Sequence, residues 1–378
     1  MKFIHLSDLH LGKRLHETNL IEDQQAIINQ ILSIIDGERP DGVIIAGDVY
    51  DKSVPSAEAV SLLDYFLVEL VKRKQQVFMI SGNHDSPERI AFGAEIMGVS
   101  GIYLSPVYNG MIKPITLNDE HGEVAVYLLP FIKPSHVRRF YENENIETYT
   151  DAVRVAIENM KVDTSKRNVL VTHQFVTGAK RSESEESVGG TDNVDFSVFD
   201  KFEYVALGHL HAPQFVGTGK IRYSGTPLKY SFAEANDTKS VTIVNLGEKG
   251  QTEIKTIDLK PFRDMKKIRG TFALLTDPAH IDREVAERDY VQITLTDEDD
   301  VPNAMSRLQT IYKYALELKY DNARTRASSM SLGAGDTQNK SAFELFSEFF
   351  IDRNNAEMND KQSAYIKSLI EKIEEENV

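Results

Sequence analysis

Apolar side chains recur at helical spacing in three segments of the N-terminal half of the chain. The first helix is expected to be capped by Thr18 or Asn19 and to end at Gly37. The second covers Ser56–Lys74 and the third Asp151–Met160. Because polar residues occupy the other positions of each segment, every helix is predicted to have one face packed on a core.

Short apolar runs of strand length separate these helices, and from Val169 onward the pattern is mostly β. The runs are Phe3–Leu6, Val43–Ala46, Val77–Ile80, Val169–Thr172, Tyr204–Leu207, Ile221–Tyr223, Val241–Leu246 and Glu253–Ile257. Such runs, bounded by turn residues, indicate buried strands. Residues 1–260 are therefore predicted to form one α/β layered domain, with its strands buried between helices.

The pattern restarts after residue 260. A strand is expected over Met265–Phe272, a helix near Pro278–Glu287, a strand over Tyr290–Thr296 and a helix from Pro302 onward. This alternation predicts a small second α+β domain over residues 261–326.

The C-terminal part reads as a linker followed by two amphipathic helices. Residues 327–340 are rich in Ser, Gly and Asn, as flexible linkers are. Residues 341–378 carry two helical patterns with the apolar side chains Phe343, Phe346, Phe349, Phe350, Ile366, Leu369 and Ile370. Two helices of this length bury little of their apolar surface against each other. The pair therefore either packs on the body or binds a partner, and the pattern leaves both possibilities open.

Composition narrows the class of protein. A chain of 378 residues is too long for one ordinary compact domain. No segment approaches 18 consecutive apolar residues, so a membrane span is not expected. The strand-like run directly after Lys2 leaves no room for a signal peptide, and the absence of cysteine fits a cytoplasmic protein without thiolate metal sites.

The net charge of -15 argues against a general nucleic-acid coat, because such proteins displace counterions with Lys and Arg. Locally the balance differs: residues 260–269 carry five basic side chains and one acidic, including Lys266, Lys267 and Arg269. Lys13 and Arg14 form a smaller basic group near the N-terminus. These residues are candidates for DNA contact, with solvated surface as the alternative.

Five clusters of metal-type ligands lie within the first 211 residues, each directly after or at the end of a strand-like run. They are Asp8-Leu9-His10, Gly47-Asp48, Gly82-Asn83-His84-Asp85, His173 and Gly208-His209-Leu210-His211. Side chains two residues apart in an extended segment point to the same face. The two ligands of Asp8-Leu9-His10 can therefore bind one ion together, and so can those of His209-Leu210-His211. Strand ends are where α/β folds place ligand sites.

The ligand set consists of imidazole, carboxylate and carboxamide groups, and it is too large for one tetrahedral zinc. It suits Mn, Fe, Zn or Co better than Mg or Ca. Two ions roughly 3.5 to 4 Å apart, bridged by a carboxylate, activate a water for attack on phosphorus. Asp48 is the natural bridge, and the clusters predict a two-metal hydrolase of phosphate esters.

His84 is interpreted differently from the other histidines. We expect it to stabilise the transition-state charge or to protonate the leaving oxygen, without binding metal. The neighbouring Asp85 is expected to hold its second ring nitrogen and so to set its tautomer.

The order D-x-H, G-D, G-N-H-D, H, G-H-x-H over residues 1 to about 230 resembles the calcineurin-like metallophosphoesterases. That superfamily includes phosphatases, cyclic-nucleotide phosphodiesterases and nucleases. The flanking strings His5–Lys13, Gly47–Asp51, Ser81–Ser86 and Arg222–Phe232 are similar to the SbcD family, the nuclease subunits of bacterial SbcCD complexes and counterparts of the archaeal and eukaryotic break-repair nucleases. The last string discriminates best, since simple phosphatases lack it.

The resemblance implies a four-layer α-β-β-α sandwich, a capping domain at residues 261–326 that contacts DNA, and C-terminal helices at 341–378 that dock on the coiled coil of an SbcC-type ATPase. It also implies two Mn²⁺ ions, with His84 as the catalytic histidine. One ion would be held by Asp8, His10, Asp48 and His211, the other by Asp48, Asn83, His173 and His209. Asp51 departs from archaeal relatives, which often have a second catalytic-site histidine there.

The family also forms homodimers through helices near the active site. The apolar candidates for that interface are Leu62, Phe66, Ile90, Phe92 and Met97, and core packing is the alternative for each.

Together these features predict an Mn-dependent DNA nuclease of repair and recombination, an exonuclease on duplex ends and an endonuclease on single-stranded or hairpin DNA. A phosphomonoesterase or cyclic-nucleotide phosphodiesterase on the same fold is the first alternative, but it has no use for a second domain and a tethered helix pair. A metal-free scaffold is the second, and the complete ligand clusters argue against it.

Overall fold

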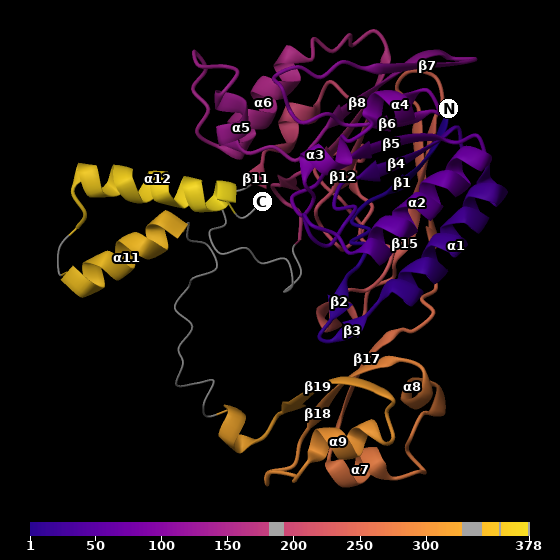
Figure 1. The fold of residues 1–378 in the computed structure, drawn as a ribbon, viewed down its shortest axis with the longest axis vertical. Helices are drawn as coiled ribbons and strands as arrows, with labels where there is room; N and C mark the ends of the chain where they lie inside the picture. Colours follow the sequence, from indigo (N-terminus) through magenta and orange to yellow (C-terminus); the bar gives the residue numbers. More distant parts are fainter. Residues whose placement is uncertain (181–192, 327–341, 355–356, 377–378) are drawn as a thin grey trace.

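The computed structural model describes residues 1–180, 193–326, 342–354 and 357–376. Figure 1 shows a large α/β body, a small unit below it and a C-terminal helix pair beside it. None of the helices in the described ranges is long and apolar enough to cross a membrane. The linker expected at 327–340 lies outside the described residues.

Two six-stranded mixed sheets form the centre of the body. The first has the order β16 (Thr252–Asp258), β15 (Ser240–Leu246), β1 (Lys2–Leu6), β4 (Gly42–Ala46), β5 (Gln76–Ile80), β6 (Ile102–Leu104). The second has the order β13 (Gln214–Phe215), β14 (Ile221–Tyr223), β12 (Tyr204–Gly208), β9 (Arg167–His173), β8 (Gly122–Leu129), β7 (Ile115–Asp119). The central strands of each sheet run parallel, so their carboxyl ends lie along one edge.

Alternate side chains of each central strand enter different cores. In β4, Ile44 and Ala46 join the apolar layer between the sheets, whereas Val43 and Ile45 pack under helices. The helices over the first sheet are α1 (Ile21–Glu38) and α2 (Ala57–Lys72), and the second sheet is covered by α6 (Tyr149–Asn159). The expected four-layer α-β-β-α sandwich is therefore confirmed.

Shorter elements connect these layers. They are β2 (Arg14–Leu15), β3 (Thr18–Asn19), α3 (Pro87–Ile90), α4 (Ala94–Gly98), α5 (Pro134–Arg138), β10 (Phe175–Val176), β11 (Asn193–Val194), η1 (Phe196–Phe199) and η2 (Phe232–Glu234). The β7–β8 hairpin was not predicted, although the run from Val124 to Leu129 is fully buried.

The expected ends of α1 are each off by one residue. Its N-cap is Leu20, which has no capping side chain, although Oδ1 of the expected Asn19 accepts the N–H of Ile21 at 3.0 Å. At its other end the helix continues through Gly37 to Glu38. The helix ends because Arg39 adopts a left-handed backbone, with φ 48°, and its N–H returns to the carbonyl of Ile35. Ile35 is 1% exposed, so burial of the apolar stripe keeps this last turn helical despite the glycine.

The small unit has its own sheet and core. Its strands β17 (Met265–Gly270), β18 (Tyr290–Leu295) and β19 (Tyr314–Tyr320) all run parallel, in that order across the sheet. The helices are α7 (Phe272–Thr276), α8 (Arg283–Glu287) and α9 (Ala304–Gln309). Met265 and Tyr290 are buried in the core cluster that lies under α1, so the unit is packed against the body.

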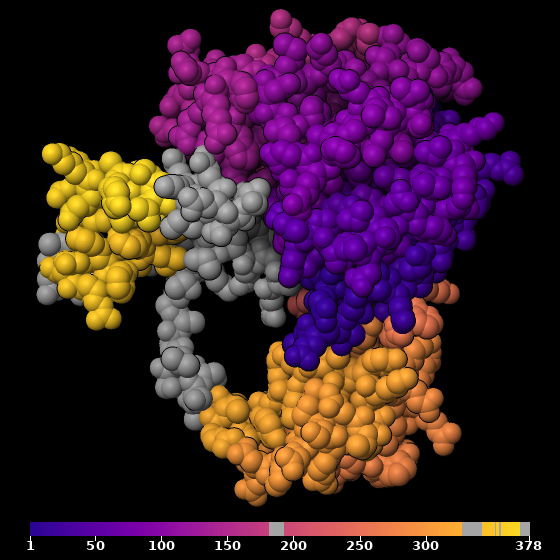
Figure 2. Space-filling model, viewed as in Figure 1, coloured from indigo at the N-terminus to yellow at the C-terminus, as the bar shows by residue number. Residues whose placement is uncertain are grey.

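The C-terminal helices α11 (Ala342–Asn354) and α12 (Asp360–Glu376) form as expected, and Figure 2 shows them projecting beside the body. Phe343 contacts Lys367 of the other helix, with the ammonium 4.9 Å from the ring centroid. Phe343, Phe350, Ile366 and Ile370 are half-buried. Phe346, Phe349 and Leu369 are exposed, Phe349 by 56%.

Three candidates for a dimer interface are core residues. Leu62, Phe66 and Ile90 are buried beneath the helices of the first sheet, which excludes them from any surface. Phe92 is 81% exposed, and Met97 is only partly buried. The interface expectation is therefore wrong for the first three and stays open for the last two.

One ionic cluster joins the edges of the two sheets. The carboxylate of Asp119, at the end of β7, accepts a hydrogen bond from the N-terminal amine of Met1 at 2.7 Å and pairs with Arg167. Arg167 is 2% exposed and also donates to the carbonyl oxygens of Gly122 and Gly247. The hydrogen bonds from Arg167 hold the pKa of Asp119 below its ordinary range.

Asp119→Ala should lower the free energy of unfolding by about 2 to 3 kcal/mol, because Arg167 would stay buried without its carboxylate. Urea denaturation at neutral pH measures the difference. The difference in unfolding free energy between the two chains should shrink as pH falls below about 4. The pKa of Asp119 is lowered in the folded chain, so the stability that its carboxylate contributes is lost when acid protonates it. Glu69→Ala, which removes surface pairs with Lys72 and Arg73, is the control; equal midpoints for Asp119→Ala and the unaltered chain would contradict the expectation.

Candidate metal centre

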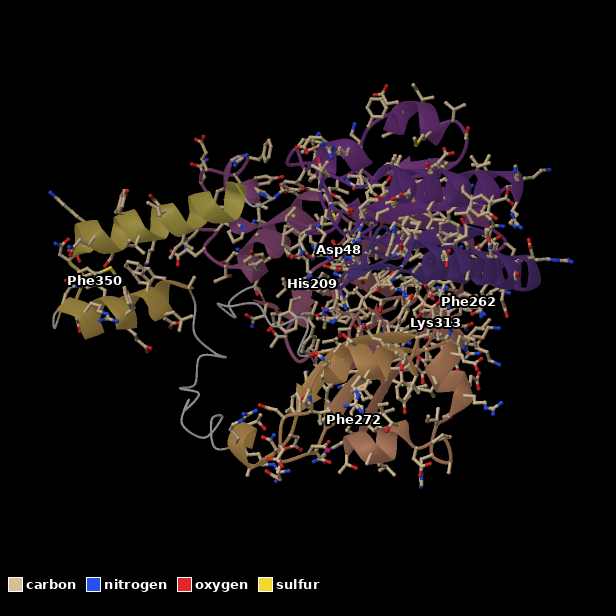
Figure 3. The ribbon with its side chains drawn as sticks, turned by 60° about the horizontal axis from the view of Figure 1, so that its bottom comes forward. Asp48, His209, Phe262, Phe272, Lys313 and Phe350 are labelled. Carbon is tan, nitrogen blue, oxygen red and sulfur yellow. The ribbon has the colours of Figure 1, made fainter. Side chains whose placement is uncertain are left out.

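All five ligand clusters meet at the edge where the central strands of both sheets end. Asp8 and Asp48 follow strands of the first sheet, whereas His173 and His209 end or follow β9 and β12 of the second. Figure 3 shows Asp48 and His209 near one another in the body. Asp8, His10, Asp48 and His173 are each at most 2% exposed, so the centre is buried.

Four of these ligand-type residues have a left-handed backbone. The φ angles are 52° at Asp8, 42° at His10, 46° at Asp48 and 106° at His209. Such conformations cost non-glycine residues on the order of 1 kcal/mol or more and persist only where neighbouring structure enforces them. Hydrogen bonds between the loops do so here: Asp8 N–H donates to the carbonyl of Gly47 at 3.0 Å and His10 N–H to that of Asp48 at 2.9 Å.

Two glycines allow the loops to approach. A Cβ atom on Gly82 would lie 2.2 Å from Oδ1 of Asp48, and one on Gly208 would lie 1.9 Å from the carbonyl oxygen of Ala46. Neither distance is compatible with a side chain. The Gly-Asn-His-Asp and Gly-His-Leu-His clusters therefore need glycine for close packing against the second strand-end loop.

The first ligand group consists of Asp8, His10 and His211, whose ligand atoms lie within 4.8 Å of one another. Both ring nitrogens of His10 are buried and have no hydrogen-bond partner among the described residues. Burial lowers the pKa of His10 well below its ordinary value, so the ring is neutral. A neutral, buried imidazole without a partner fits a metal ligand, because an ion satisfies the nitrogen that nothing else does.

The second group is organised around the amide of Asn83. Its Oδ1 lies 2.9 Å from Nδ1 of His209 and 3.0 Å from Nε2 of His173. Nδ1 of His173 donates to the carbonyl of Ala46 at 2.8 Å, which directs Nε2 toward the centre. The residues present therefore fit a second ion as well.

Asp48 lies between the two groups. Its Oδ2 is 3.6 Å from Nε2 of His10 and 3.3 Å from Nε2 of His173. Although burial opposes it, the Asp48 carboxylate raises the pKa of His173 to about 9. In turn His173 outweighs the burial of Asp48 and lowers the pKa of that carboxyl well below its ordinary value. An ion would replace the proton that His173 holds.

Glu234 was missed by the sequence reasoning. It is 1% exposed, its Oε1 lies 3.1 Å from Nδ1 of His211, and Lys239 Nζ pairs with its Oε2 at 2.7 Å. Burial opposes ionisation, but His211 and Lys239 lower the pKa of Glu234 to about 2. This carboxylate orients the ligand ring. The only signal was its position two residues after the Arg222–Phe232 string.

The expected pairing of Asp85 with the His84 ring is wrong. The Asp85 carboxylate accepts hydrogen bonds from the backbone N–H groups of Val49, Tyr50 and Gly82. It therefore joins two loops, because three converging N–H groups occupy its oxygens. Nδ1 of His84 instead donates to the backbone carbonyl of Asp51 at 3.1 Å.

His84 lies at the open side of the centre, with 43% of its side chain exposed. Nε2 is 4.0 Å from Oδ2 of Asp48, and the ring could complete an ion site with His10 and Asp48. A carbonyl can only accept, so Nδ1 carries the hydrogen and Nε2 is the atom that exchanges a proton. Geometry alone therefore allows both a ligand and an acid-base role.

Four of the five residues expected to contact DNA have partners among the described residues. Lys13 pairs with Asp51 at 2.7 Å, and Arg14 donates to the carbonyl of Glu17. Lys266 pairs with Asp264 at 2.7 Å, and Arg269 with Asp321. Lys267 is exposed. DNA contact by these residues stays a prediction.

The chain is similar to two known protein families and to a bacterial nuclease subunit. Residues 1–213 match the calcineurin-like phosphoesterase family, and residues 261–354 match the family described as the type 5 capsule protein repressor C-terminal domain. The chain is 31% identical over 379 residues to the SbcD subunit of the SbcCD nuclease from Staphylococcus epidermidis, with 98% of each chain covered.

Solved structures give a weaker likeness. The protein TT1561 of Thermus thermophilus is 12% identical, with a TM-score of 0.40 over 68% of this chain and 98% of that one. A dimetal phosphatase from Danio rerio is 11% identical, with a TM-score of 0.38 over 68% and 95%. At these TM-scores the likeness supports no further conclusion.

Metal content separates the roles of Asp48 and His84. With Mn²⁺ as the probe ion, the unaltered chain and His84→Gln should each retain two ions per chain, because both ligand groups are complete without His84. Asp48→Asn should bind at most one tightly, because the carboxylate between the groups is lost. Elemental analysis after gel filtration measures the ratio; loss of an ion from His84→Gln would make that histidine a ligand.

Proposed function

The chain belongs to the calcineurin-like phosphoesterase family and, within it, to the family of SbcD nuclease subunits, and on that premise we propose that it is an Mn²⁺-dependent DNA nuclease. The reaction is hydrolysis of phosphodiesters, as an exonuclease on duplex ends and an endonuclease on single-stranded or hairpin DNA, in DNA repair and recombination. The observation that carries the proposal is the convergence on Asp48 of imidazoles from both sheets, at 3.6 Å for His10 and 3.3 Å for His173.

Two divalent ions bound here would bind phosphate oxygens and lower the pKa of an attacking water. One would be held by Asp8, His10, Asp48 and His211, and the other by Asp48, Asn83, His173 and His209. The mixed nitrogen and oxygen ligands favour Mn²⁺ over Mg²⁺. The protein supplies geometry: Glu234 fixes the His211 ring and Ala46 fixes the His173 ring.

His84 is proposed as the group that handles protons at the leaving oxygen. Its Nδ1 is held by the Asp51 carbonyl, and its Nε2 faces the centre from the exposed side. A histidine that lies at the mouth of a buried ion site can reach both substrate and solvent, as proton transfer requires. Asp85 supports this role indirectly by joining the Val49–Tyr50 and Gly82 loops.

Two surfaces support the proposed partners. The exposed Phe346, Phe349 and Leu369 of the helix pair suit docking on an SbcC-type ATPase. A second apolar surface around α4 exposes Phe92 by 81%, Ile96 by 79% and Val99 by 91%, and we assign the homodimer contact to it. The small unit, with the exposed Lys267, is the proposed DNA contact.

A hairpin DNA labelled at one end and incubated with Mn²⁺ tests the activity directly. Cleavage is expected, and His84→Gln should slow it by about 100-fold or more while metal content is retained, since positioned acid-base groups contribute that much. A mononucleotide ester is the control substrate. Hydrolysis of the ester with an intact hairpin would assign the chain to the phosphomonoesterases.

The helix pair can be tested separately. Deleting residues 335–378 should abolish co-elution with an SbcC-type ATPase on a sizing column, yet leave Mn²⁺-dependent cleavage of single-stranded DNA unchanged. Phe346→Asp combined with Phe349→Asp should weaken binding similarly, because charges replace exposed apolar contacts. Lys361→Ala, a polar change on the same pair, is the control. Continued complex formation by the deletion variant would exclude this docking site.

A further inference from the structure

Two pairs of adjacent residues connect the small unit to the metal centre. One pair, Asp23 and Gln24, lies in the first turn of α1. The other, Lys229 and Tyr230, lies in the loop before η2. In each pair the first residue binds the small unit or the segment leading into it, and the second binds the loop that carries His10.

Asp23 makes the first contact. Its carboxylate is 2% exposed, and Oδ2 accepts hydrogen bonds from the hydroxyl of Tyr290 and from Arg263, both at 2.8 Å. Tyr290 begins β18 of the small unit and is itself 2% exposed. A buried carboxylate held by a hydroxyl and a guanidinium fixes the distance between α1 and the small unit.

Gln24 continues the connection toward the centre. Its Nε2 donates to the carbonyl of His10 at 2.7 Å, and its Oε1 accepts from the N–H of Gly12 at 2.9 Å. The amide is buried, so both ends of the side chain are committed to the His10 loop. A shift of the first turn of α1 would therefore pull on the backbone of a ligand residue.

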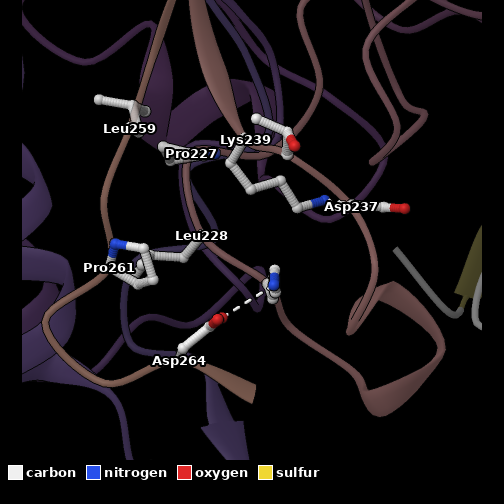
Figure 4. A pocket seen from close by; sticks show the side chains of 9 residues that line it. Pro227, Leu228, Asp237, Lys239, Leu259, Pro261 and Asp264 are labelled. Atoms are coloured by element: carbon white, nitrogen blue, oxygen red, sulfur yellow. Dashed lines mark hydrogen bonds and ion pairs between the residues drawn. The ribbon is translucent and has the colours of Figure 1, made fainter. Parts of the chain in front are cut away.

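The second pair repeats this arrangement. Lys229 Nζ pairs with Asp264 at 2.8 Å, the dashed line in Figure 4. The pair lies at the edge of a cavity of about 220 Å³ between the body and the segment that leads into the small unit. The hydroxyl of Tyr230 donates to the carbonyl of Leu9 and accepts from Gln24. The Tyr230 ring lies edge-on to His10, with ring centroids 5.7 Å apart.

The backbone of His10 explains why these contacts matter. Its φ of 42° is a conformation that a non-glycine residue keeps only when surrounding bonds enforce it. Gln24 binds the carbonyl of that residue, and Tyr230 binds the carbonyl of the preceding one. Loosening either bond lets the peptide relax and moves the imidazole.

We propose that the position of the small unit sets the geometry of His10 through these two pairs. Gln24 and Tyr230 are positioning residues, and Asp23 and Lys229 are the contacts through which the small unit acts on them. The inference rests on the proposed two-metal function of the centre. Whatever displaces the small unit, DNA included, would thereby change the ion-binding geometry some distance away.

Tyr290→Phe and Asp23→Ala cut the first connection, through Asp23 and Gln24, without touching a ligand. Tyr290→Phe keeps the buried ring and removes one hydrogen bond, so it remains informative if Asp23→Ala fails to fold. Asp36→Ala is the matched control, because Asp36 lies at the opposite end of the same helix and, among the described residues, pairs with Arg73 alone. Thermal melting of each variant verifies that it is folded.

Hydrogen exchange on the metal-free chain gives the first readout. The amide of Gly12, which depends on Gln24, should exchange about tenfold faster in Asp23→Ala and less so in Tyr290→Phe, with no change in Asp36→Ala. Calorimetric titration with Mn²⁺ gives the second readout. The affinity of Asp23→Ala for Mn²⁺ should fall about tenfold, which is the lower end of the range for loss of a group that orients a metal ligand.

Hydrolysis of bis-p-nitrophenyl phosphate gives the third readout, because so small an ester has no need of the small unit. For Asp23→Ala, kcat should fall at saturating Mn²⁺ with KM little changed. Unaltered exchange at Gly12 together with unaltered Mn²⁺ affinity in both variants would overturn the coupling through Asp23 and Gln24. If the unaltered chain hydrolysed neither this ester nor DNA, the proposed function would be refuted. The hydrogen-exchange and Mn²⁺-binding measurements would still test the coupling.

Discussion

The carboxylate of Asp48 is the interaction on which the rest of the site depends. It contacts imidazoles from both sheets, at 3.6 Å for His10 and 3.3 Å for His173, and its other oxygen accepts the backbone N–H of His84 at 2.9 Å. Buried charge of this kind is costly unless it is compensated. His173, whose pKa Asp48 raises to about 9, compensates part of it with a proton in the metal-free chain, and divalent ions would do so more fully. Ion binding and protonation therefore compete for the same positions.

Holding Asp48 there requires a rigid frame. The apolar layer between the sheets fixes the strand ends, and hydrogen bonds between the loops maintain left-handed backbones at Asp8, His10 and Asp48. Gly82 and Gly208 let the loops meet at distances that no side chain would allow. The large core thus stabilises a locally unfavourable arrangement, which is how strained functional sites persist. Asp85 belongs to this frame, since its carboxylate gathers three backbone N–H groups.

The same frame extends to the small unit. Met265 and Tyr290 are buried in the core under α1, so the two parts share apolar packing as well as the Asp23 and Lys229 contacts. A phosphoesterase body could function without such an attachment. Hydrogen bonds from Gln24 and Tyr230 connect this attachment to the loop of His10. Residues 327–341, which lie between the small unit and the α11–α12 pair in the sequence, are outside the described ranges.

The sequence by itself determined most strands of the body, though not the β7–β8 hairpin, as well as the four-layer arrangement by resemblance and the ligand clusters, because apolar periodicity and glycine before a ligand are local signals. It failed where the decisive contact joins residues far apart along the chain. The partners of Asp85, the Glu234 carboxylate behind His211 and the bond from Tyr290 to Asp23 follow from no spacing rule. The end of α1 also depends on packing. The helix continues past Gly37 because burial of Ile35 outweighs the low helix propensity of glycine. Only the folded chain decides such contacts, because they depend on which surfaces the sheets bring together.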